Sequence, residues 1–538
     1  MRTFCLALLA LLVPTIALAD DRPNILLIVA DDLGYADLGA YGGDIDTPAI
    51  DSLARDGILF TQFHTAPMCS PTRAMLLSGN NNHVAGIGRQ GGEDMLAPQS
   101  TLREYMPGFE GHLSDRIAPL PGLLRDAGYH TYSVGKWHLG VEADQSPHAA
   151  GFERAFNMVQ GAANHWDSRG FHEGGSIFRL DENLVEWPEG RYSTDLYTER
   201  LIDFIDSNTG DGQPFFAFAA YTSPHWPLQV PDEYLDLYAG RYDAGYDVLR
   251  QERLESLQQA EIVPAGTGLP PRNDAVTPWH ELSAEQKRRE SRKMELYAAM
   301  VDNLDDHVGR LLQHLRDTGL LDNTLVVFMS DNGAAAEDFY NGSPYKDYVR
   351  ANYDNAYEKM GGPDSFVSYG PPWAEAGSAP FSRHKGYSRE GGIVAPLIVA
   401  GTGVAASGII DSSYLTVMDL APTFLGLAGA TYPDDGTVQP MLGESVAPLL
   451  AGDADRVHGE DYVTAFYHGG RAMLRKGRWK ISTLERPFDA KNFELFDVIA
   501  DPGETTNLAG TQPEIYRELI DTWDTQRRSL GILLPEDI

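Results

Sequence analysis

Short apolar runs alternate with amphipathic stretches along most of this chain. The first run, residues 23–30, is continuous and is followed by Asp-Asp-Leu-Gly at 31–34. Such a run is typical of a strand that is buried on both faces of a parallel sheet. Similar strand-like runs lie at residues 129–134, 215–221, 324–330 and 393–400.

Helical patterns lie between these runs. A Thr-Pro pair at 47–48 predicts a helix that continues to residue 54, because Thr favours the position before a helix and Pro its first turn. Further helices are predicted at residues 117–127, 195–207 and 289–315. This alternation predicts an α/β core. Two stretches without a strong period, 226–285 and 334–390, are expected to form site walls or lids, or surface insertions.

The pattern changes past residue 430. Short strand-like runs with turns between them lie at residues 462–467, 472–474, 479–482 and 493–496, and a last helix is predicted at about 513–528. This pattern predicts a smaller C-terminal α+β domain with an antiparallel sheet. The chain of 538 residues is long enough for two domains, and we place them at 20–430 and 431–538.

The N-terminus reads as a secretory signal peptide over residues 1–19. It has a basic start, a mostly apolar segment over 4–16 and a small-residue cleavage site at 17–19. The apolar segment is short for a membrane span, and no later run is long enough, although a retained anchor is the alternative. The sequence therefore predicts use of the export machinery, a periplasmic or secreted protein, and no stable membrane insertion after cleavage.

Charge and cysteine content restrict the partners. The formal net charge is −35, and such a surface repels nucleic acid, so an anionic substrate would need a local cationic site. Of the two cysteines, Cys5 leaves with the signal peptide, so Cys69 has no partner for an intramolecular disulfide. A lone thiol in an exported protein must be buried, chemically converted or paired between chains.

Cys69 stands in a distinctive pentapeptide, in which Pro71 and then Arg73 follow it. Pro71 suits the first position of a helix, and the apolar residues 75–77 continue that helix. Cys69 would then lie at a helix N-terminus, which favours an anion or an activated nucleophile, with Arg73 on the same face. The alternative is a small buried thiol beside a surface arginine.

Polar residues follow several predicted strands, where ligands of open α/β sheets gather. Asp31 and Asp32 follow the first strand, and Asp331 and Asn332 follow the strand at 324–330. Their oxygens suit Ca²⁺ or Mg²⁺, although both sequences also occur in ordinary turns. Cationic or titratable residues in comparable positions are Lys136, His138, His225 and Lys385. If the chain stays extended after residue 134, Lys136 and His138 point to the same side, as suits an anionic substrate and proton transfer.

Together these motifs resemble those of the type I sulfatases, and within that family the bacterial arylsulfatases. The matching segments are Cys69-Ser70-Pro71-Thr72-Arg73, Gly135 to Gly140, Asp31-Asp32, Asp331-Asn332-Gly333 and His384-Lys385-Gly386, with support from 110–116 and 151–165. The resemblance implies an alkaline phosphatase/sulfatase-like fold, with a large mixed, mostly parallel sheet flanked by helices. It also implies hydrolysis of small sulfate esters, with aryl sulfates favoured.

The resemblance further implies the chemistry of the site. A maturation enzyme would oxidise Cys69 to formylglycine, whose hydrate attacks sulfur and later collapses to expel sulfate. One Ca²⁺ would be held by Asp31, Asp32, Asp331, Asn332 and the modified Cys69. Arg73 and Lys136 would position the hydrate, and Lys136 and Lys385 would neutralise charge on the sulfuryl oxygens. Asp331 would accept a proton from the attacking hydroxyl, and His138 would accept one from the second hydroxyl. His225 or Lys385 would protonate the leaving group.

Two other functions remain open from the sequence. Hydrolases of phosphate monoesters, phosphate diesters or phosphonates use similar metal sites and the same cysteine motif. A catalytically inactive, Ca²⁺-dependent binding protein on this scaffold is a further alternative. The sequence does not identify the physiological ester or the oligomeric state.

Overall fold

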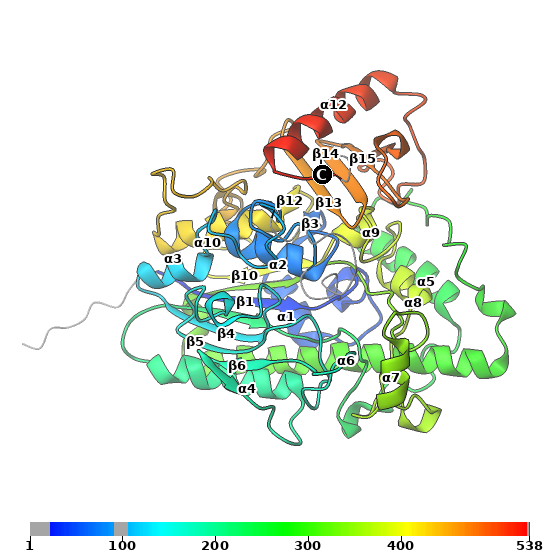
Figure 1. Ribbon diagram of the computed structural model, residues 1–538, viewed down its shortest axis with the longest axis horizontal. Coiled ribbons are helices and arrows are strands. Elements are labelled where there is room, and N and C mark those ends of the chain that lie inside the picture. Colours follow the sequence, from blue (N-terminus) through cyan, green and yellow to red (C-terminus); the bar gives the residue numbers. More distant parts are fainter. Residues whose placement is uncertain (1–21, 91–105, 535–536, 538) are drawn as a thin grey trace, which may run out of the picture.

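The computed structural model describes residues 22–90, 106–534 and 537, so the predicted signal peptide lies outside the described residues. A ten-stranded mixed sheet forms its centre (Figure 1). Strand β1 (Asn24–Ala30) runs parallel to β8 (Phe215–Ala220) on one side and to β9 (Thr324–Ser330) on the other. Next to β8 lie β4 (His130–Lys136) and β5 (Arg154–Met158), also parallel. No described helix is long and apolar enough to cross a membrane.

The outer strands make the sheet mixed. Both β10 and β6 pair antiparallel with their inner neighbours, β9 and β5. The remaining outer strands complete the order β11-β2-β10-β9-β1-β8-β4-β5-β6-β7. Their bounds are β2 (Gly57–Phe60), β6 (Phe178–Leu180), β7 (Asn183–Val185), β10 (Leu397–Gly401) and β11 (Ile409–Asp411), and a separate pair joins β3 (Phe63–His64) to β12 (Leu415–Thr416). The predicted α/β class with a mixed, mostly parallel sheet is confirmed.

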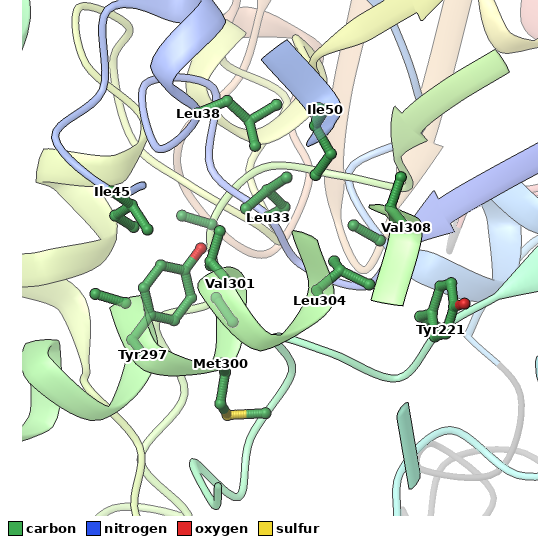
Figure 2. Packing of buried hydrophobic residues seen from close by; sticks show 14 of the residues in the cluster. Leu33, Leu38, Ile45, Ile50, Tyr221, Tyr297, Met300, Val301, Leu304 and Val308 are labelled. Atoms are coloured by element: carbon green, nitrogen blue, oxygen red, sulfur yellow. The ribbon is translucent and has the colours of Figure 1, made fainter. Parts of the chain in front are cut away.

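Strand β1 is buried on both faces, as its continuous apolar run predicts. Its alternate side chains belong to two hydrophobic cores: Leu26 and Ile28 face one, and Ile25 and Leu27 face the other. Helices α4 (Ser193–Asn208) and α6 (Ala284–Asp317) cover the first face, and α2 (Cys69–Ser78), α3 (Leu120–Asp126) and α10 (Leu420–Ala428) cover the second (Figure 1). Figure 2 shows Val301 and Leu304 of α6 beside Leu33, which follows β1.

A separate four-stranded antiparallel sheet lies near the C-terminus, as predicted. Its strands are β13 (Val463–His468), β14 (Arg471–Lys476), β15 (Trp479–Ser482) and β16 (Glu494–Asp497). Helix α12 (Pro513–Ser529) covers one face with Leu519 and Trp523 (Figure 1). On the other face, Phe466 and Met473 join the second core of the large sheet. The small sheet is therefore packed between its own helix and the main body.

Two sequence predictions are wrong in detail. The apolar run at 393–400 is not one strand, because α9 (Glu390–Ile393) ends at Ile393 and β10 begins at Leu397. A short apolar run does not distinguish a buried helix from a strand. The stretches without a strong period also contain helices, namely α5 (Tyr246–Gln259), α7 (Lys346–Asn352) and α8 (Pro371–Gly377). The remaining helices are α1 (Pro48–Asp56) and α11 (Ala447–Leu450).

Candidate active site

The sheet brings the predicted polar residues to one edge. Asp31 and Asp32 follow β1, Asp331 and Asn332 follow β9, and Lys136 is the last residue of β4. Ala30 at the end of β1 is in register with Ser330 at the end of β9. Because the central strands are parallel, their carboxyl ends meet at the same edge of the sheet.

Cys69 is the first residue of α2 and is fully buried. Its Sγ lies 3.7 Å from Oδ1 of Asp32. The prediction that Pro71 opens the helix is wrong by two residues, since Met68 is the N-cap and Pro71 lies within the first turn. A helix leaves its first N–H groups without intrahelical partners, so Pro is tolerated in this turn. Cys69 is at the helix N-terminus as predicted.

Arg73, one helical turn after Cys69, joins three parts of the site. Its Nε and Nη2 atoms lie 3.0 and 2.8 Å from Oδ2 of Asp331. Its Nη1 donates to the carbonyl oxygen of Lys136 at 2.8 Å. The guanidinium is fully buried, so these contacts replace water and fix α2 against the ends of β9 and β4.

Each aspartate after β1 has a lysine partner. Lys136 Nζ contacts both carboxylate oxygens of Asp31, at 2.9 and 2.8 Å. Lys385 Nζ contacts Oδ2 of Asp32 at 2.8 Å. All four side chains are almost completely buried. Burying an ion pair costs desolvation free energy unless the two groups meet in good geometry. The short contacts between these lysines and aspartates provide that geometry.

Asn332 and His225 complete the group around Asp32. Asn332 Nδ2 donates to Oδ1 of Asp32 at 2.6 Å, and His225 Nε2 lies 3.3 Å from Oδ2 of Asp32 and 3.5 Å from Lys385 Nζ. The Nδ1 atom of His225 donates to the carbonyl oxygen of Trp226 at 2.7 Å, which leaves Nε2 as the acceptor in a neutral ring. Sequence reasoning did not identify this orienting contact, because a backbone carbonyl has no sequence signature.

Burial and charge together set the protonation of these groups. Burial raises the pKa of the Cys69 thiol well above its usual value, although Lys136 and Lys385 act in the other direction. Burial also raises the pKa of Asp331 to about 6, with Asp31 adding to the shift and Arg73 opposing it. Burial holds the pKa of His225 well below its usual value. An unmodified Cys69 is therefore a neutral thiol, and His225 is a neutral imidazole.

The oxygen atoms fit a hard divalent cation. Ligand atoms of Asp31, Asp32, Cys69 and His225 all lie within 4.8 Å of one another. Asn332 Oδ1 is buried and has no hydrogen-bond partner, so it is a ready acceptor beside Asp32. Carboxylate and amide oxygens are the ligands that Ca²⁺ prefers. Asp331 accepts from Arg73 at Oδ2 and from the backbone N–H of Asp32 at Oδ1, so Oδ1 keeps a lone pair for a cation.

His138 lies differently from the prediction. Strand β4 ends at Lys136, and His138 has a left-handed backbone with φ of 60°, so the chain does not stay extended between them. The ring packs on Gly161, where an added Cβ would lie 2.7 Å from His138 Cε1. His138 lines a cavity of about 210 Å³ with Gly161 and Phe171.

Comparison with known proteins agrees with this geometry. The sulfatase domain family matches residues 23–430, and the family described as N-sulphoglucosamine sulphohydrolase, C-terminal, matches residues 384–528. An uncharacterised sulfatase of Schizosaccharomyces pombe is 37% identical, over 96% of this chain and 95% of its own. The arylsulfatase of Klebsiella aerogenes is 36% identical, over 80% of this chain and 93% of its own.

Two solved structures are similar in fold. The crystal structure of Ps i-CgsB in complex with k-i-k-neocarrahexaose has a TM-score of 0.66 and 23% identity, covering 94% of this chain and 92% of that one. The phosphonate monoester hydrolase of Agrobacterium radiobacter has a TM-score of 0.56 and 19% identity, covering 95% of this chain and 96% of that one. At these identities the likeness concerns the fold.

Proposed function

The chain belongs to the sulfatase family and is a sulfuric ester hydrolase, and we propose that it cleaves small sulfate esters, aryl sulfates among them, with a nucleophile made from Cys69. The observation that carries this proposal is the position of Cys69, buried 3.7 Å from Asp32 and among Arg73, Lys136 and Lys385. A neutral, buried thiol is a poor nucleophile. Oxidation of Cys69 to formylglycine by a maturation enzyme would supply an aldehyde hydrate, whose hydroxyl can attack sulfur.

One Ca²⁺ ion fits the oxygen atoms at this edge of the sheet. We assign it to Asp31, Asp32, Asn332 and the modified Cys69, with Asp331 as a further ligand. When bound, the ion would act as a Lewis acid that polarises a sulfuryl oxygen. The described site pairs three buried carboxylates with three buried cations, so a divalent cation would make it positive and favourable for a sulfate ester.

The remaining residues would orient the reactants and move protons. Arg73 and Lys136 would hold the hydrated side chain at position 69, and Lys136 and Lys385 would neutralise negative charge on the sulfuryl oxygens. Asp331, which accepts from Arg73 at Oδ2, would receive the proton of the attacking hydroxyl.

Two histidines would complete the proton transfers. Lys385 Nζ would protonate the departing alcohol or phenol. His225 would do so after its Nε2, which lies 3.5 Å from Lys385 Nζ, has taken up a proton from that lysine. His138 would accept a proton from the second hydroxyl of the hydrate at position 69.

Phosphate esters and phosphonates are the competing substrates, because the phosphonate monoester hydrolase shares this fold. A phosphate monoester carries nearly one more negative charge than a sulfate monoester, so the number of positive charges in the site affects which of the two esters is preferred. The arylsulfatase of Klebsiella aerogenes, at 36% identity, favours sulfate for this chain. An inactive binding protein is disfavoured because each expected catalytic position holds the expected residue type.

We also propose that the protein is exported and acts in the periplasm or outside the cell. The basic start, apolar segment and small-residue site over residues 1–19 support this location. The large negative charge is compatible with a small substrate and disfavours nucleic acid as a partner.

Three measurements test the proposal. Mass spectrometry of the peptide that contains Cys69 should show the sulfur replaced by an aldehyde oxygen. The specificity constant for nitrophenyl sulfate should exceed that for nitrophenyl phosphate, and Cys69→Ala should abolish turnover with little effect on folding. A reactive thiol at position 69 in active protein, or a clear preference for phosphate, would overturn the assignment.

A further inference from the structure

A cavity of about 420 Å³ opens beside the candidate active site. Met68 and Lys385 line it on the side of the site, so it begins next to Cys69. Arg471 and Arg486 line it on the side of the C-terminal sheet. Its volume is within the range of small-molecule sites. A substrate whose sulfate contacts Lys385 could therefore place its alcohol portion in this cavity.

Arg471 is held in place without an acidic partner. Its Nε donates to the carbonyl oxygen of Leu484 at 2.8 Å, and its Nη1 donates to that of Gly386 at 2.9 Å. Its guanidinium carbon lies 3.9 Å from the ring centroid of Tyr387. Among the described residues, no carboxylate forms an ion pair with Arg471 within 4.0 Å. The charge is thus rigidly placed and not neutralised by direct contact.

Arg486 adds a second charge to the same wall. Within the described ranges it makes no hydrogen bond or ion pair, and it is exposed. Burial, together with Arg486, lowers the pKa of Arg471 to about 10. Burial, Arg486 and Arg471 also lower the pKa of His468, which lines the cavity, to about 3. Burial is the larger cause of both shifts, and the neighbouring arginines act in the same direction, whereas Glu485 opposes the shift at Arg471.

One acid, Glu337, lines the cavity. Its Oε2 is buried without a hydrogen-bond partner, and its charge helps to raise the pKa of Lys385, against burial. Among the described residues, Glu337 forms no ion pair with Arg471 or Arg486. A carboxylate without a donor can accept a hydrogen bond from a hydroxyl group.

We propose that Arg471 and Arg486 bind a second anionic group of the substrate, a carboxylate or a further sulfate on its alcohol portion. This inference rests on the proposed function and names the substrate class: sulfate esters that carry an additional negative charge. The chain has a net charge of −35, so most of its surface is acidic. Two arginines that line one cavity and form no ion pair within the described part of the chain differ from that surface. Guanidinium groups match the planar oxygen pairs of such anions.

The test compares two substrates, 4-nitrophenyl sulfate and the same compound with a ring carboxylate. Arg486→Gln is the informative variant, because Arg486 is exposed and makes no hydrogen bond or ion pair within the described ranges. Its KM for the carboxylated substrate should rise about tenfold, as expected for loss of a charge-assisted contact, with kcat unchanged. Its KM for nitrophenyl sulfate should stay within about twofold.

Arg517→Gln is the matched control. Arg517 is exposed on α12, has no recorded ion pair among the described residues, and lies outside the cavity lining. This variant removes the same charge and should leave both KM values unchanged. Equal effects of Arg486→Gln on the two substrates, or no effect on either, would overturn the inference.

A binding experiment separates this inference from the proposed function. Calorimetric titration with the desulfated, carboxylated nitrophenol should show binding to the wild type that is about tenfold weaker in Arg486→Gln. If no sulfate ester were hydrolysed but this difference persisted, the proposed function would fail and the anion site would stand. If esters were hydrolysed and the two proteins bound the anion equally, the anion site would be refuted.

Discussion

Substitution of Lys480 by Met should destabilise the attachment of the C-terminal sheet to the main body. Lys480 lies on β15 and is fully buried. Its Nζ contacts Oε1 of Glu390 at 2.6 Å and Oε1 of Glu504 at 3.0 Å. Glu390 begins α9, five residues after Lys385. The lysine therefore joins the small sheet to the segment that carries a proposed catalytic residue.

The expected cost follows from what remains after the substitution. Glu390 keeps His64, whose Nε2 lies 3.0 Å from its Oε2. Glu504 keeps Arg389 Nη1 at 3.7 Å and the short contact from the backbone N–H of Glu390. Removing one partner of a buried ion pair costs about 3–5 kcal/mol, because a charge is left without compensation. We expect Lys480→Met to lower the free energy of unfolding by that amount at pH 8.

The loss should be smaller at lower pH. Burial already raises the pKa of Glu504, against the effect of Lys480 and Arg389. Without Lys480 that pKa rises further, so the folded state takes up a proton at higher pH than the unfolded state. Stability is then regained as the pH falls below the new folded pKa and lost as the pH rises through it. The double variant Lys480→Met/Glu504→Gln should recover about 1–3 kcal/mol at pH 8.

Urea unfolding at pH 8 and pH 5.5, followed by tryptophan fluorescence, measures these differences. Lys476→Met is the matched control, because Lys476 on β14 pairs with Glu518 at 2.9 Å and is partly exposed. A surface pair of this kind contributes about 1 kcal/mol or less. The reasoning is refuted if Lys480→Met costs no more than Lys476→Met, or if the double variant is as unstable as Lys480→Met.

Three further predictions concern other parts of the molecule. Arg73→Lys keeps the charge but cannot make the forked contacts to Asp331 and the Lys136 carbonyl, so turnover of nitrophenyl sulfate should fall about 100-fold or more; near-normal turnover would contradict the positioning role. Chelation of Ca²⁺ should lower the melting temperature, because an ion present at 100 times its Kd adds about 2.7 kcal/mol to the free energy of unfolding. Added Ca²⁺ should restore the melting temperature, and an unchanged melting curve would argue against a calcium site. Burial, with a smaller effect of His468, lowers the pKa of His83 to about 3. The wild type should therefore lose stability as the pH falls below 6.5, by about 2 kcal/mol at pH 5, because the folded state keeps His83 neutral. In His83→Gln the urea midpoint should change less between pH 7 and pH 5 than in the wild type. The same pH dependence in both proteins would refute this.

Much of the large sheet could be predicted because its strands are buried on both faces. Continuous apolar runs such as residues 324–330 have few alternative structures, and β9 occupies those residues. The run at 393–400 failed for a physical reason. Only Ile393 of this run belongs to α9, and Pro396, which has no N–H to donate to a sheet, directly precedes the start of β10 at Leu397. Helix α5 was not predicted because most of its residues are polar.

The candidate site was predictable as a set of residues but not as a set of pairs. Position after a strand places Asp31, Asp331 and Lys136 at one edge of the sheet, whatever the order of the strands. Which carboxylate meets which cation depends on where α2 and the segment before α9 reach this edge. They bring together residues 258 apart in Arg73–Asp331 and 353 apart in Lys385–Asp32. The direction of His138 depends on a left-handed backbone that no periodicity indicates.

The two sheets divide the work of the proposed active site. The large sheet supplies the carboxylates and cations around Cys69, whereas the small sheet supplies Arg471 to the adjacent cavity. Arg471 also donates to the carbonyl oxygen of Gly386, so the small sheet contacts the residue next to Lys385 directly. Changes in the 463–497 region should therefore alter which ester is accepted more readily than they alter the sulfur chemistry. Lys480 is the exception, since its loss would loosen both the cavity wall and the segment that carries Lys385.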